Sequence, residues 1–221
     1  MNIAGIVKTS TIDYLGKIAS VVFVAGCNYD CWFCHNRALL SNPPLLDEGE
    51  FFSFLRKRAN VLEGVVISGG EPTQQKDLFS FAAKIKDIGY SVKLDTNGSN
   101  PKILSSLLQN SIIDYVAVDY KAPFEKYFDI CKHDASGVEE CIEILRQSTI
   151  SWEMRTTLIP QLSTDDLVAM AERAPQLPLY ALQKYRNIGY DERDETCNTC
   201  QIEELIDIVK RYQPNVVARG F

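Results

Sequence analysis

Three cysteines lie close together near the N-terminus of the chain, in the segment CNYDCWFC at residues 27–34. Thiolate sulfur is a soft ligand that suits iron–sulfur clusters. A four-iron cluster ordinarily takes four cysteines, so three in one tight loop leave one iron open to a substrate or a cofactor. The residue types and their spacing therefore predict such a cluster at Cys27, Cys31 and Cys34.

The remaining cysteines leave a second interpretation open, because Cys197 and Cys200 are separated by two residues and could complete a zinc site. Structural zinc takes four ligands, usually in two pairs. Taken alone, this pair is compatible with half a metal site, a redox pair or an inert pair. Cys131 and Cys141 are expected to be buried as small apolar residues. A disulfide framework is a poor explanation for seven cysteines, an odd number, in a chain of this length.

Polar motifs follow three further apolar runs. Residues 68–72 read Ser-Gly-Gly-Glu-Pro, residues 95–98 read Asp-Thr-Asn-Gly, and residues 119–121 read Asp-Tyr-Lys. Glycine lets the backbone approach a ligand closely, and proline fixes a turn. Each motif also has a plain structural interpretation, as a tight turn or as a solvated charged loop. Arg155 is a charge inside an apolar run; it is either salt-bridged or outward-facing, or it contacts an anionic ligand, which its forked cation suits.

Short β-branched runs alternate with longer amphipathic segments along the chain, which predicts an α/β fold with a parallel sheet and helices outside it. A curved, barrel-like sheet is favoured over a flat one. The motifs then lie at the C-terminal ends of the strands, where such folds carry their chemistry. The expected strands are 18–25, 64–68, 91–95, 114–119, 153–159 and 179–185. The expected helices are 47–59, 76–88, 101–109, 138–147, 164–173 and 202–212.

Composition narrows the class of protein. Apolar residues make up 46% and charged residues 24% of the 221, which is typical of a globular protein. A net charge of −6 argues against a nucleic-acid partner. The longest apolar stretch, residues 18–27, is too short to span a bilayer, and the first residues lack a secretory signal. We therefore expect a single-domain cytoplasmic protein with no membrane or nucleic-acid partner.

The spacing of the three cysteines resembles that of the radical S-adenosylmethionine superfamily. There the cysteines bind a 4Fe-4S cluster, and the amino and carboxylate groups of S-adenosylmethionine chelate the fourth iron. The resemblance implies both cofactors, with Phe33, just before the third cysteine, near the adenine. Residues 69–72 match the superfamily's GGEP motif, which implies that Gly69, Gly70 and Glu71 hold the amino group of the cofactor.

Within the superfamily, the chain is most similar to glycyl-radical-enzyme activating proteins. His35 and Asn36 complete a Cys-x-x-Cys-His-Asn run, and residues 95–98 and 119–121 resemble the corresponding loops of that group. His35 is expected to pack or hydrogen-bond near the cluster. The resemblance implies that the cofactor is faced by Asp95, Asp119 and Lys121, and that a monovalent cation is enclosed by Asp95, Thr96 and Asp119.

Two later strands supply further candidates for the pocket. Arg155 in the fifth expected strand is a candidate contact to the cofactor carboxylate or to the negative charge of the cluster. Gln183 and Tyr185 in the sixth are candidates for lining the pocket.

The resemblance implies a partial (β/α)6 TIM-like barrel over residues 1–221, forming a single radical S-adenosylmethionine domain whose open side accepts a loop of another protein. A flavodoxin or ferredoxin would supply the electron for cleaving S-adenosylmethionine to a 5′-deoxyadenosyl radical. That radical would take a hydrogen atom from a glycine of the partner, and the pattern looks most like the activating protein of anaerobic ribonucleoside-triphosphate reductase.

Two alternatives stay open at the level of sequence. One is a radical enzyme that acts on a small molecule, as 7-carboxy-7-deazaguanine synthase does. The other is a non-catalytic iron–sulfur or zinc protein, with a fully ligated metal and no affinity for S-adenosylmethionine.

Overall fold

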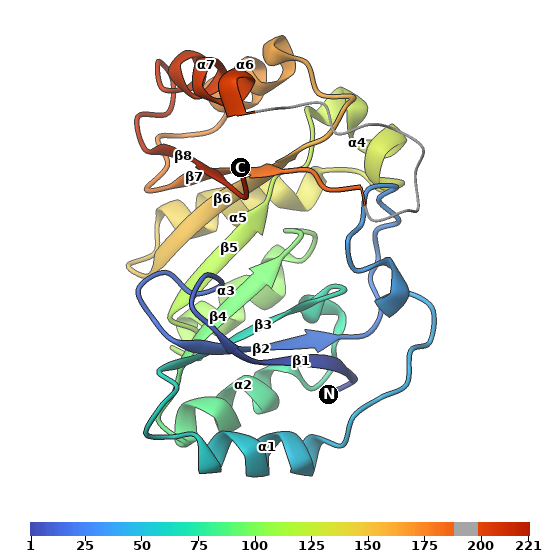
Figure 1. Ribbon diagram of the computed structural model, residues 1–221, viewed down its shortest axis with the longest axis vertical. Coiled ribbons are helices and arrows are strands. Elements are labelled where there is room, and N and C mark those ends of the chain that lie inside the picture. The colour runs from blue at the N-terminus through green and yellow to red at the C-terminus, as the bar shows by residue number, and fades with distance from the viewer. Residues whose placement is uncertain (188–198) are drawn as a thin grey trace.

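One curved sheet of eight strands organises the protein in the computed structural model, which describes residues 1–187 and 199–221, without the side chains of residues 199 and 200. The strands lie side by side in sequence order from β1 to β8 (Figure 1). β1 (Ile3–Ser10) and β2 (Ala19–Val24) are antiparallel, and every later neighbouring pair is parallel. Because β1 and β8 are not paired with each other, the barrel is open between these two edge strands.

The six predicted strands are all present, each within a few residues of its expected bounds. Their central residues are buried because both faces of a barrel sheet are covered. After β2 they are β3 (Gly64–Gly69), β4 (Ser91–Thr96), β5 (Tyr115–Asp119), β6 (Ser151–Leu158) and β7 (Tyr180–Lys184).

The sequence did not reveal the two edge strands, β1 and β8 (Val216–Arg219). Each pairs on one side only, and several of their residues are exposed, which weakens the apolar pattern. The six predicted β–α units are thus confirmed, and the sheet extends by one strand at each edge.

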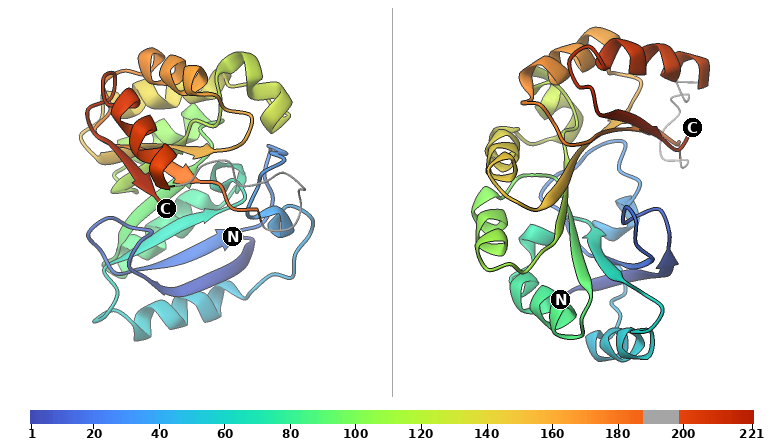
Figure 2. Two further views of the ribbon diagram at one scale, coloured as in Figure 1. Left: turned by 45° about the horizontal axis from the view of Figure 1, so that its top comes forward. Right: turned by 90° about the vertical axis from the view of Figure 1, so that its left-hand side faces the viewer.

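Helices cover the convex face of the sheet, and the strands form an arc inside them (Figure 2). Local sequence fixes the starts of two of these helices: Ser163 caps α6 through a capping box, and Pro101 opens α3. None of the helices in residues 1–187 and 199–221 has both the length and the hydropathy that a bilayer crossing requires. The helices on this face are α1 (Glu48–Lys57), α2 (Leu78–Asp87), α3 (Pro101–Gln109), α5 (Ser136–Arg146), α6 (Thr164–Arg173) and α7 (Thr199–Val209).

One short helix was missing from the sequence prediction. α4 (Phe124–Cys131) begins directly after Pro123 and ends where Lys132 adopts a left-handed conformation, with φ of 56°. Eight residues give too few turns for a clear helical period, so its presence depends on packing. It precedes α5 at the end of β5.

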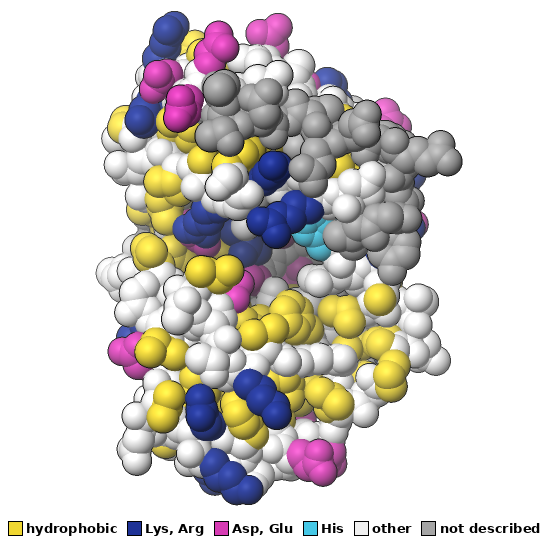
Figure 3. All heavy atoms as spheres, viewed as in Figure 1, with side chains coloured by type: hydrophobic (Ala, Val, Ile, Leu, Met, Phe, Trp, Pro, Cys, Tyr) yellow, Lys and Arg dark blue, Asp and Glu magenta, His cyan; other side chains and the backbone are white. Residues whose placement is uncertain are grey.

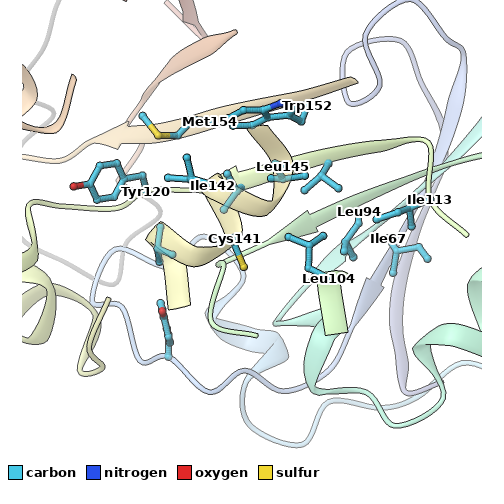
Figure 4. Close-up of a cluster of buried hydrophobic side chains, with 14 of the residues drawn as sticks. Ile67, Leu94, Leu104, Ile113, Tyr120, Cys141, Ile142, Leu145, Trp152 and Met154 are labelled. Carbon is cyan, nitrogen blue, oxygen red and sulfur yellow. The ribbon is translucent and has the colours of Figure 1, made fainter. Parts of the chain in front are cut away.

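The core lies between the sheet and these helices. Figure 4 shows a part of it, where α3 and α5 place Leu104, Cys141, Ile142 and Leu145 near Leu94 of β4. All five side chains are almost completely buried. Since burial of such a side chain contributes about 1.5–3 kcal/mol, this packing holds the strands firmly enough to position the loops at their ends.

Candidate active site

A cavity of about 340 Å³ lies at the C-terminal ends of the parallel strands. The space-filling view shows a hollow in this face, with acidic side chains inside it and lysine and arginine side chains above it (Figure 3). Eleven of the twelve residues predicted from the sequence line this cavity: Cys27, Cys31, Phe33, Cys34, Gly69, Gly70, Asp95, Thr96, Asp119, Lys121 and Arg155. The topology thus gathers residues that are up to 128 positions apart, 155 minus 27, around one space.

The cysteine loop is fastened on one side by α4, the helix that the sequence did not reveal. The backbone N–H of Asp30 donates to the carbonyl of Cys131 at 3.0 Å, and that of Trp32 donates to Ile130 at 3.4 Å. Tyr29 packs edge-to-face on Tyr127 of the same helix, with ring centroids 6.2 Å apart. The last carbonyls of α4, which have no partner within the helix, therefore bind the loop on both sides of Cys31.

On its other side the loop is joined to β3. The Asn36 side-chain amide donates to the carbonyl of Gly69 at 3.0 Å. Arg37 donates to the carbonyl of Cys31 at 3.1 Å and pairs with Asp30 at 2.8 Å. The loop is therefore held between β3 and α4, which fixes the direction of its three thiols.

A network of buried charges forms the wall opposite the cysteines. Arg155 on β6 donates from Nε to Asp119 Oδ1 at 2.8 Å and from Nη1 to Asp95 Oδ2 at 3.0 Å. Lys121 donates to Asp119 Oδ2 at 2.9 Å, and Lys93 pairs with Asp95 Oδ1 at 3.1 Å. One arginine thus joins the ends of β4 and β5. Arg155 is salt-bridged and lines the cavity, and its contact to an anionic ligand stays a prediction.

The charges in this network hold one another in the ionised state. Burial alone would raise the pKa of Asp119, but the charges of Arg155 and Lys121 outweigh it and lower that pKa to about 2. The pKa of Asp95 is lowered in the same way, by Arg155 and Lys93 against the effect of burial. The cavity therefore presents fixed charges of both signs, suitable for a zwitterionic ligand.

Glu71 is the one of these twelve residues that does not line the cavity. Its side chain is fully buried, and Oε1 accepts from the backbone and hydroxyl of Thr73 at 3.0 and 2.6 Å and from the Thr96 hydroxyl at 2.8 Å. Oε2 accepts from the backbone N–H of Asn97 at 2.7 Å. Burial raises the pKa of Glu71, while these donors oppose the rise. The carboxylate joins the β3 loop to the β4 loop.

The two glycines before Glu71 are required by contacts inside the protein. A Cβ on Gly70 would lie 1.9 Å from the carbonyl oxygen of Gly26, and Gly69 has a φ of 113°. The Gly70 N–H donates to Val24 at 2.9 Å. The ends of β2 and β3 therefore approach so closely that only glycine fits, and this brings the β3 loop next to the cysteine loop.

The family follows from comparison with known proteins. The model of the Radical SAM superfamily matches residues 21–174. The chain belongs to the radical S-adenosylmethionine superfamily. A radical S-adenosylmethionine enzyme uses a 4Fe-4S cluster and S-adenosylmethionine.

One relative of this radical S-adenosylmethionine enzyme is similar to it over nearly the whole length of both chains. It is a Methanocaldococcus jannaschii protein named "Putative glycyl-radical enzyme activating enzyme MJ1227", 36% identical, with 98% of this chain and 95% of the relative covered.

Solved structures show the same fold at lower identity. Streptococcus suis SuiB bound to precursor peptide SuiA has a TM-score of 0.71 at 14% identity, covering 90% of this chain and 48% of SuiB, so this chain spans about half of that protein. A domain of pyruvate-formate lyase-activating enzyme from Bacteroides vulgatus has a TM-score of 0.59 at 16% identity, covering 71% of this chain and 99% of that domain. At these identities the likeness shows the fold alone.

The donor set of this enzyme fits a cluster better than a single ion. Cys27, Cys31 and Cys34 line one cavity, yet among the described residues no three His, Cys, Asp or Glu side chains group closely enough to hold one metal ion. A cluster distributes its ligands over several irons, so separated thiols suit it. Burial raises the pKa of Cys27 to about 12, and the pKa of Cys34 is raised for the same reason. Binding of iron must therefore displace protons from these thiols.

The structure also shows where the remaining candidate residues from the sequence lie. His35 lines the cavity and stacks on Tyr185, with ring centroids 6.2 Å apart. Gln183 lines the cavity as predicted, whereas the prediction that Tyr185 lines it is wrong. Cys131 and Cys141 are buried as predicted. Cys197 lies outside the described residues, as does the side chain of Cys200. Asp13 and Thr157 also line the cavity and were missed, because neither belongs to a motif.

Glu71→Gln is expected to destabilise the fold by about 1–3 kcal/mol, because the amide places an NH₂ group against donors that have no other buried acceptor. Thermal unfolding followed by circular dichroism checks this, with the exposed Glu172→Gln as the matched control. Unchanged stability together with weakened binding of S-adenosylmethionine would instead make Glu71 a direct contact to the cofactor.

Proposed function

We propose that this enzyme generates a glycyl radical on a partner protein, and that the partner is an anaerobic ribonucleoside-triphosphate reductase. The observation that carries the proposal is the 36% identity, over 98% of the chain, to a relative named as a glycyl-radical enzyme activating enzyme. The sheet supports it, because β1 and β8 are not paired with each other and leave one side of the barrel open to a loop of a protein substrate.

Different residues of the cavity would hold the cluster and the S-adenosylmethionine. Cys27, Cys31 and Cys34 would hold the cluster, which supplies the electron for reductive cleavage of the sulfonium cofactor. Phe33 lies beside Lys121, whose Nζ is 5.8 Å from the centre of its ring, and offers an apolar face to an adenine. Asp95, Asp119 and Arg155 would orient the amino and carboxylate ends of the cofactor, with Gly69, Gly70 and Thr96 shaping the wall.

Glu71 acts in this scheme through its neighbours. Its hydrogen bonds set the positions of Thr96 and Asn97 at the cavity, so we propose it as a positioning residue in place of the direct contact that the motif implied.

Four further predictions belong with this proposal. A flavodoxin- or ferredoxin-type protein supplies the electron, and the protein works in the cytoplasm as one domain over residues 1–221.

A monovalent cation at Asp95, Thr96 and Asp119 would have to share carboxylates that already pair with Arg155, Lys93 and Lys121. Cofactor affinity measured in potassium and in a large organic cation tests that point.

The experiment that tests the proposal is anaerobic. The reconstituted enzyme is incubated with dithionite, S-adenosylmethionine and an anaerobic ribonucleoside-triphosphate reductase. We expect 5′-deoxyadenosine by chromatography and a glycyl radical signal by electron paramagnetic resonance. 5′-Deoxyadenosine without a glycyl radical on any glycyl radical enzyme would favour the small-molecule alternative. A cluster spectrum that does not respond to S-adenosylmethionine would favour the non-catalytic one.

A further inference from the structure

A side chain from outside the cysteine loop reaches one of its three sulfurs. The Nδ2 atom of Asn97 lies 3.7 Å from Cys27 Sγ and 2.9 Å from Asn28 Oδ1. A side-chain amide has two N–H groups, so it can serve both acceptors at once. Its Oδ1 accepts from the backbone N–H of Ser99 at 2.9 Å, and its own backbone N–H donates to Glu71. Asn97 is therefore held firmly, with one N–H directed at a cysteine sulfur.

Loading the cysteines with iron keeps the direction of this hydrogen bond. A cysteine that ligates iron has lost its proton, so the sulfur of Cys27 can then only accept. The amide nitrogen of Asn97 can only donate.

We propose that Asn97 is a positioning residue that donates a hydrogen bond to the cluster thiolate of Cys27 and thereby raises the reduction potential of the cluster. The reduced cluster carries one more negative charge than the oxidised cluster, so a donor aimed at its sulfur stabilises the reduced form more. The inference rests on the assignment of the cluster to the three cysteines. It adds a role for one residue of the Asp-Thr-Asn-Gly motif.

The test is a redox titration of the reconstituted enzyme without S-adenosylmethionine. Dithionite and mediators set the potential, and the reduced cluster is followed by electron paramagnetic resonance. For Asn97→Ala we expect a roughly tenfold lower equilibrium constant for one-electron reduction, which is a shift of about 59 mV to more negative potential.

Cys141→Ala is the matched control. This buried thiol donates to the carbonyl of Gly98 at 3.2 Å and lies in the core beside Ile142 and Leu145 (Figure 4). We expect the wild-type potential for this variant. A wild-type potential in Asn97→Ala, or an equal shift in Asn97→Ala and Cys141→Ala, would overturn the inference.

Iron and sulfide contents separate this result from failure of the proposed function. A wild-type protein that assembles no four-iron cluster overturns the cluster assignment and the inference together. Where the wild-type cluster assembles, a lower potential in cluster-loaded Asn97→Ala supports the inference, and any other outcome overturns it.

Discussion

Cys31→Ala is expected to abolish reductive cleavage of S-adenosylmethionine, a loss of at least a thousandfold. Cys31 is the central cysteine of the loop, and the contacts from α4 fix the backbone on both sides of it. Removing its sulfur leaves two of the three thiols, so the cluster would lose one of its ligands. Production of 5′-deoxyadenosine by the anaerobically reconstituted variant, measured by chromatography alongside its iron content, checks this result.

The fold of this variant should persist, because the exchange occurs in a loop whose backbone hydrogen bonds are retained. Cys141→Ala removes an equally buried thiol outside the cavity and should cleave the cofactor at the wild-type rate. Circular dichroism of both variants establishes that they are folded. Full cleavage by Cys31→Ala would remove Cys31 from the cluster and reopen the other metal-binding interpretations.

Arg155→Met should be the most destabilising single change at the site, at about 3–5 kcal/mol. The substitution leaves Asp95 and Asp119 without the cation that pairs with both of them, and uncompensated buried charge carries a cost of this size. It should also weaken binding of S-adenosylmethionine, because the ends of β4 and β5 lose the group that joins them. Thermal unfolding and cofactor titration on the same preparation measure the two effects.

Arg155→Lys refines this test, since a single ammonium group cannot reach two carboxylates in the way that the guanidinium fork does. The unfolding temperature of Arg155→Lys should lie between that of the wild type and that of Arg155→Met. Arg146→Met is the matched control, because that arginine pairs with Glu143 on the surface and its removal should leave the unfolding temperature unchanged. A wild-type unfolding temperature for Arg155→Met would show that Lys93 and Lys121 suffice to balance the two carboxylates.

The cavity of this protein illustrates why short motifs predict sites well in a parallel α/β barrel. Cys27, Gly69, Asp95 and Asp119 each stand at or just beyond the end of a predicted strand, and parallel strands bring those ends to one edge. Local periodicity was therefore enough to collect eleven of the predicted residues around one space. The cysteine spacing then specified the chemistry, because three thiols in one loop suit few other ligands.

The roles of individual side chains within that space depended on the tertiary structure. Glu71 belongs to a cofactor-binding motif, yet its carboxylate already accepts hydrogen bonds from Thr73, Thr96 and Asn97. Arg155 had two equal interpretations in the sequence, and the structure confirms the salt-bridged one, with partners 36 and 60 residues away in the chain. Such pairings are set by strand register across the sheet, which no local pattern encodes.

The sequence by itself determined the family of the chain, the alternation of strands and helices, and eleven of the residues around the cavity. Only the tertiary structure decided that β1 and β8 complete the sheet, that α4 holds the cysteine loop, and that Asn97 reaches the sulfur of Cys27. The physical reason is the range of the interactions. Periodicity and ligand spacing act between near neighbours in the chain, whereas edge pairing, helix docking and buried hydrogen bonds join residues that meet only once the sheet has formed.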